Sequence, residues 1–148
     1  MNLSELMVDT KSAWVEYPGY EGFEVEVVNL SRPELTALRK RCLITKYDKN
    51  TRKPVEELNE EKFISEFTKA TIRNWKGFKY KFLQDFVLVD ISKVDPEKEL
   101  AYSQDNAKLL VTNSSEFDTW VNDTVFDLEN FRTEPKGTNV AATGKVAE

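Results

Sequence analysis

The segment from Gln104 to Arg132 constrains the fold more than any other part of the chain, because its apolar residues recur at helical spacing. The pattern predicts a short helix capped by Ser103, a break, and a longer helix capped by Ser115. The short helix carries Ala107, Leu109, Leu110 and Val111. One side of the longer helix gathers Phe117, Trp120, Val121, Thr124, Leu128 and Phe131. The pattern indicates packing, and no chemistry follows from it.

The length of 148 residues fits one domain with a core of its own. Apolar residues make up 40% and charged residues 32%, and no apolar run approaches the roughly 18 residues that cross a membrane. The N-terminus lacks the pattern of a secretory signal. A single cysteine, Cys42, excludes an internal disulfide and fits a reducing compartment. We therefore expect a cytoplasmic protein without a membrane segment.

Charge is distributed unevenly along the chain. Residues 1–81 contain 15 Lys and Arg against 13 Asp and Glu, whereas residues 82–148 contain 6 against 13. This polarity could steer a partner or promote head-to-tail self-association, or it could be a solvated surface of uneven composition.

The N-terminal half predicts a hairpin followed by two helices. Alternation in Trp14–Tyr17 and Gly22–Val27 indicates two strands around a Pro-Gly turn. Ser31 and Glu34 form a capping box for a helix that buries Leu35, Leu38 and Cys42. Residues 47–57 are polar and predict an exposed loop. The next helix should run from Asn59 to Trp75 and end at Gly77.

Residues 78–92 fit either a strand or a short helix followed by an extended segment, and we favour the latter. Residues 133–148 lack aromatics and periodicity, which indicates a disordered tail. The predicted fold is α+β and mostly helical, with an N-terminal β-hairpin packed on about four helices. Residues 1–12 would form a flexible arm, 13–132 a single globular domain and 133–148 a flexible tail.

The sequence offers little for catalysis or for ligand binding. It contains no histidine, which excludes Ser-His-Asp and Cys-His sites, and it contains no glycine-rich phosphate loop. Asp123 and Asp127 stand one helical turn apart, but such pairs usually border an exposed face. The basic stretch from Arg39 to Lys53 sits in a chain of pI near 5.0, which argues against nucleic-acid binding. We expect no enzyme, no cofactor, no metal, no nucleic acid and no membrane partner.

The order of these elements resembles the tail assembly chaperones of long-tailed, siphovirus-type bacteriophages. Their pattern is an aromatic strand, an S-R-x-E-L-type helix, a W-x-G element, an E-N-A-x-x-L-L-like helix and a final F-x-x-W helix. The matching residues are Ser31, Arg32, Glu34, Leu35, Trp75, Gly77, Asn106, Ala107, Leu109, Leu110, Phe117, Trp120, Val121, Leu128 and Phe131. The chain departs from the pattern at Asp105, where a Glu is common, and in its long connection over residues 78–103.

The resemblance implies a non-enzymatic assembly factor in the cytoplasm of the infected bacterial host. Such a protein binds the tape measure protein, keeps it soluble until the tail tube polymerises, and is absent from the mature virion. The resemblance also implies self-association, and a frameshifted longer form that recruits the major tail (tube) protein. The competing interpretation is a structural virion protein, such as a tail-completion or connector subunit.

For the partner-binding surface we expect apolar residues outside the core. The candidates are Trp14, Tyr17 and Tyr20 of the hairpin, and Ile72, which faces away from the apolar stripe of its predicted helix. The alternatives are that Trp14 packs on the helices and that Ile72 makes a second internal contact.

Overall fold

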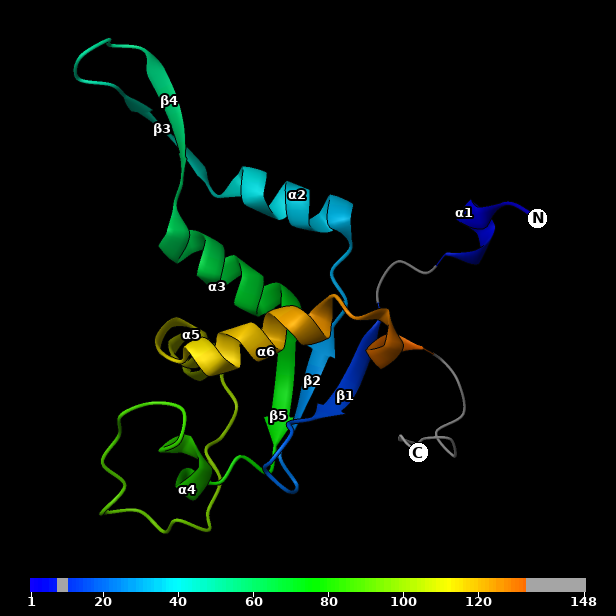
Figure 1. The fold of residues 1–148 in the computed structure, drawn as a ribbon, viewed down its shortest axis with the longest axis vertical. Coiled ribbons are helices and arrows are strands. Elements are labelled where there is room, and N and C mark those ends of the chain that lie inside the picture. Colours follow the sequence, from blue (N-terminus) through cyan, green and yellow to red (C-terminus); the bar gives the residue numbers. More distant parts are fainter. Residues whose placement is uncertain (8–10, 133–148) are drawn as a thin grey trace.

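A three-stranded antiparallel sheet with helices over one face forms the centre of the structure (Figure 1). The computed structural model describes residues 1–7 and 11–132. The strands, in spatial order, are β1 (Ser12–Glu16), β2 (Glu24–Val28) and β5 (Ile72–Lys76). The predicted N-terminal hairpin is confirmed, with Val15 opposite Val25, and β5 extends it into a sheet.

In the described part of the chain, four helices are ten to twelve residues long. They are α2 (Arg32–Arg41), α3 (Glu60–Thr71), α5 (Gln104–Asn113) and α6 (Ser115–Val125). The short elements are α1 (Leu3–Leu6), α4 (Tyr80–Leu83) and the 3₁₀ turn η1 (Leu128–Phe131). The predicted α+β fold is therefore confirmed. The predicted tail, residues 133–148, lies outside the described residues.

Side-chain caps begin the long helices where the sequence predicted them, with one shift. Ser31 accepts a hydrogen bond from the Glu34 amide and completes a capping box. The side chains of Asn59 and Ser103 cap α3 and α5, each by accepting a hydrogen bond from the amide three residues on. The last helix is capped by Ser114 instead of Ser115.

The helix predicted for residues 59–75 is wrong beyond Thr71, because the chain continues as β5. Ile72 and Trp75 are both buried, and a spacing of three suggested one face of a helix. In β5 a bulge opposite Glu26 and Val27 inserts Arg73 as an extra residue. The bulge turns both Ile72 and Trp75 toward the core, which a regular strand of period two would not allow.

The exposed loop predicted at residues 47–57 is confirmed over residues 48–53, which form the turn of a second hairpin, and is wrong at residue 47 and residues 54–57, which are strand. Strands β3 (Leu43–Tyr47) and β4 (Pro54–Leu58) pair antiparallel and project away from the rest of the molecule (Figure 1). Their side chains are almost all exposed, as the polar sequence indicated. At the base of the hairpin, the Asn59 amide donates a hydrogen bond to the Cys42 carbonyl at 2.8 Å. The two ends of the hairpin are therefore close together in space. We call residues 43–58 the arm.

The closing apolar stripe is divided between two elements. Helix α6 ends at Val125, and the 3₁₀ turn η1 carries Phe131 into the core. Leu128, predicted on the same buried side, is 67% exposed because the stripe is not one continuous helix. Cys42 is fully buried, as expected for a small core residue.

Candidate partner-binding surface

Trp14 lies on the face of the sheet away from the helices. It stands opposite Glu26, and 37% of its surface is exposed. The Lys76 ammonium sits 4.5 Å from the centre of its ring, a cation–π contact, and also pairs with Glu24 at 3.8 Å. Trp14 is thus on the surface, as expected, but it stands among charged residues.

Tyr17 is a core residue, so the expectation that it lies outside the core is wrong. Only 4% of it is exposed, and its ring packs 4.6 Å from Trp120 and 5.4 Å from Phe23, between centroids. Its hydroxyl donates to a Glu116 carboxylate oxygen at 3.0 Å. Burial, followed by this hydrogen bond and the Glu116 charge, raises the pKa of Tyr17 well above its ordinary value.

Tyr20 is half-buried beside Tyr17, with ring centroids 5.7 Å apart. It contacts the rings of Phe82 and Phe86 at 5.2 Å and donates a hydrogen bond to Asp85 at 3.3 Å. Burial and then the Asp85 charge raise the pKa of Tyr20. The β1–β2 turn is therefore held against the segment after α4, and most of its aromatic surface is used internally.

Ile72 is fully buried, so of the two alternatives the internal contact is confirmed. Its carbonyl accepts a hydrogen bond from the Tyr102 hydroxyl at 3.0 Å. The structure brings Tyr17 and Tyr20 together, while Trp14 and Ile72 lie on different faces of the sheet. The four residues predicted as a partner-binding surface do not form one.

A different apolar surface is exposed along α5. On one side of this helix is a hollow of about 540 Å³, which we call the first hollow. Its apolar lining comes from α4, from the segment after it and from α5: Leu83, Val87, Leu88, Val89, Leu109 and Leu110. Leu88 is fully exposed, and Leu109 is 59% exposed. Two large apolar side chains are therefore exposed to solvent at this hollow.

On the other side of α5 lies a second hollow of about 670 Å³. It is lined by Ile64 of α3, by Leu109 and Thr112, and by the charged residues Glu61, Asp105 and Lys108. Leu109 lines both hollows and forms the ridge between them. We call the two hollows and this ridge the α5 groove.

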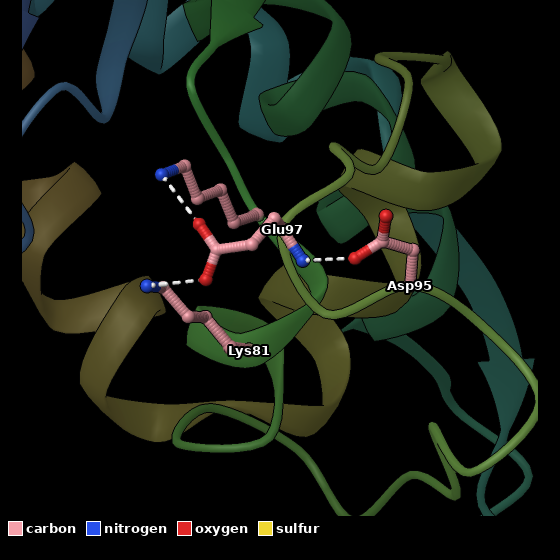
Figure 2. Close-up of polar contacts among 4 residues, drawn as sticks. Lys81, Asp95 and Glu97 are labelled. Carbon is pink, nitrogen blue, oxygen red and sulfur yellow. Dashed lines mark hydrogen bonds and ion pairs between the residues drawn. The ribbon is translucent and has the colours of Figure 1, made fainter.

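Partly exposed ion pairs connect the segment after α4 to α4 itself. Glu97 binds Lys79 at 3.0 Å and Lys81 at 2.7 Å, which ties the end of the 84–99 segment to α4. Figure 2 shows Glu97 between Lys81 and Asp95. The Asp95 carboxylate accepts a hydrogen bond from the Glu97 amide at 2.9 Å. The hydrogen bonds from Lys81 and Lys79 lower the pKa of Glu97. Leu88 and Val89 are thus carried on a segment anchored at both ends.

The helical spacing of Leu109 indicates that it lies off the buried face of α5, although its neighbours in the sequence are also apolar. Ala107, Leu110 and Val111 share one helical face and are buried. Leu109 is offset from Leu110 by one position, which is about 100° on a helix, and therefore points elsewhere. The exposed position of Leu109 can therefore be derived from the helical spacing once the buried face is known.

Other site types are not evident in the described residues. Within residues 1–7 and 11–132, no three Asp, Glu or Cys side chains form a group that could hold a metal ion. None of the helices in this part of the chain is long and apolar enough to cross a membrane. Comparisons with protein-family models, with curated proteins and with solved structures found no match.

Proposed function

We propose that this protein is a non-enzymatic tail assembly chaperone of a siphovirus-type bacteriophage. It binds the tape measure protein in the cytoplasm of the infected host and keeps it soluble for tail-tube polymerisation. It is then left out of the mature virion. The partner's identity rests on the sequence resemblance.

The observation that carries the proposal is the α5 groove. A long helical client exposes apolar faces and aggregates unless a binder covers them. A chaperone for it needs an accessible apolar surface on a stable domain, and Leu88, Val89 and Leu109 supply one. By contrast, Phe117, Val121 and Phe131 of the resemblance motifs are buried, so they support the fold.

We also propose that the protein self-associates through the arm. The arm is a two-stranded hairpin, which is marginal in water by itself, and it exposes Ile44, Tyr47 and Val55. Its turn carries three cations, Lys49, Arg52 and Lys53, against the single carboxylate of Asp48, while Lys46 of β3 is paired with Glu57. The segment after α4, residues 84–99, has five acidic and two basic residues and lies at the opposite end of the molecule (Figure 1). Opposite charges at opposite ends favour head-to-tail contacts.

Replacing residues 44–57 with a short turn tests this contact. Light scattering measures the particle mass of both proteins at low and at high salt. At low salt, the wild-type particle should be heavier than that of the shortened protein. Because Cys42 and Asn59 are already joined by a hydrogen bond, the shortened chain should fold. Equal masses for both proteins would refute the role of the arm.

The client proposal is tested by co-expression with the product of the very long reading frame expected beside this gene. We expect soluble tape measure protein that co-purifies with this chain. An insoluble client and no recovered complex would refute the proposal. A frameshifted longer form, if made, should in addition retain the major tail protein.

The alternative is a structural virion protein, for which the projecting arm is the favouring observation, since ring subunits often join through such hairpins. Mass spectrometry of purified virions separates the two functions. We expect no stoichiometric copies. Abundant copies would establish the structural alternative.

A further inference from the structure

We propose that the α5 groove binds one basic amphipathic helix. Its apolar side chains enter the two hollows on either side of Leu109, and its Lys or Arg side chains face Glu61 and Asp105. This inference rests on the proposed chaperone function and names the chemistry of the client segment.

The shape of the groove suits a helix. Leu109 lines both hollows, so a bound segment must place apolar side chains on either side of it. Residues i, i+3, i+4 and i+7 of an amphipathic helix form a continuous apolar stripe that is broad enough to do so.

The groove also lacks what a strand would need from its receptor. Strand addition uses the free backbone of a sheet edge. The groove is lined by α4 with the segment after it, by α5 and by α3, none of which is a β-strand of a sheet edge, and the amides within α5 and α3 are bonded inside their helices. Side-chain anchors must therefore supply the affinity, which is the way amphipathic helices bind grooves.

The charges around the groove select a basic partner. Glu61 and Asp105 line the second hollow with only Lys108 of opposite sign. Among the described residues, none of these three side chains forms an ion pair. The described stretch from 82 to 132 has 11 acidic against 4 basic residues, which attracts a cationic segment from a distance. A lysine-rich flank on the client would complement both the rim and the wider field.

Three synthetic helical peptides test the inference. Each carries leucines at i, i+3 and i+7; the first has lysines on its flanks, the second glutamates, and the third is the lysine peptide with a central proline. Fluorescence anisotropy should show the lysine peptide binding at least about tenfold tighter than the other two. Equal binding of all three, or no binding of the lysine peptide, would overturn the proposal.

Leu109→Gln and Leu128→Gln form a matched pair of variants. Both residues are largely exposed, so both variants should fold, but Leu128 belongs to η1 and does not line the groove. Leu109→Gln should weaken the lysine peptide about tenfold, whereas Leu128→Gln should leave it unchanged. Reversing both carboxylates, with Glu61→Lys and Asp105→Lys, should transfer the preference to the glutamate peptide. If the rim reversal leaves the preference unchanged, charge selection is wrong.

Three further outcomes distinguish a failure of this inference from a failure of the proposed function. If Leu109→Gln keeps the full-length tape measure protein as soluble as wild type does, the groove assignment fails and the chaperone function stands. If wild type itself fails to keep that protein soluble, the chaperone function fails. If Leu109→Gln lowers the oligomer mass and leaves peptide binding intact, the groove holds a second copy and the inference is wrong.

Discussion

Substituting Gly77 by Ala should destabilise the domain strongly, because this glycine meets the β1–β2 turn backbone to backbone. Gly77 has φ of 73°, and an added Cβ would overlap the Gly22 carbonyl oxygen and lie 2.6 Å from the Gly22 carbonyl carbon. Left-handed backbone costs an L side chain roughly 1–2 kcal/mol. An overlap that forces packed backbone apart adds about 1–3 kcal/mol.

The chain offers a matched control for this substitution. Gly19 also has positive φ, at 88°, but a Cβ there meets nothing within 4 Å. Both alanines lower the entropy of the unfolded chain, which offsets about 0.4–1 kcal/mol. We therefore expect the free energy of unfolding to fall by about 2–4 kcal/mol for Gly77→Ala and by about 1 kcal/mol for Gly19→Ala.

Urea unfolding followed by the fluorescence of Trp75 and Trp120, which are buried and half-buried, measures both changes. The dependence on urea concentration should keep its slope, so that the midpoints report stability alone. Equal losses for the two alanines would show that the Gly22–Gly77 contact is not tight and would refute the reasoning. The expected difference also gives the W-x-G element a physical basis, since Gly77 is required by a close approach.

Three further predictions concern the core and the arm. Trp120→Ala should lower the free energy of unfolding by about 3 kcal/mol, because Trp120 packs on Tyr17 and Phe117. Leu128→Ala, at an exposed position, should change it by less than about 0.5 kcal/mol. A folded Trp120→Ala protein of wild-type stability would contradict the core assignment. Because burial and Glu116 raise the pKa of Tyr17, its contribution to stability is complete below about pH 10 and declines above it, where the unfolded chain ionises first. Urea midpoints of wild type should therefore fall more steeply between about pH 10 and 12 than those of Tyr17→Phe, and parallel curves would exclude this linkage. In hydrogen exchange, amides of the arm should exchange far faster than those of β2, since nearly all arm side chains are exposed while Val25 and Val27 are fully buried; similar protection in both would imply that the arm is already covered by a partner.

Local signals predicted most of the fold. Ser31, Asn59 and Ser103 begin their helices in the structure as the sequence indicated, because a cap depends on a side chain and an amide three residues away. The first hairpin was likewise evident from period-two alternation around a Pro-Gly turn.

The errors arose where the pattern depended on distant contacts. Residues 54–57 were predicted as loop because the arm buries no face, so its strands lack the apolar alternation that marks a half-buried strand. β5 was predicted as helix because its bulge gives the core residues Ile72 and Trp75 a helical spacing.

The binding surface was the least predictable part. Tyr17 was expected outside the core, yet it bonds to Glu116, 99 residues away. For Ile72 the sequence left an internal contact and a partner contact open, and the structure buries it, with its carbonyl bonded to Tyr102, 30 residues away. Neither contact leaves a trace in the local sequence. From the sequence, Leu109 had no place distinct from Ala107, Leu110 and Val111 of the same helix, yet it is exposed and they are buried.

The sequence by itself determined where the long helices begin, which turn opens the sheet and that the fold is α+β, since these depend on residues a few positions apart. Only the tertiary structure decided which apolar side chains remain at the surface. Burial depends on which elements meet, and the packing of α5 against α3 and α6 buries Leu110 and leaves Leu109 exposed. The closing stripe of α6 is core for that reason, and the candidate binding surface lies on the helix before it.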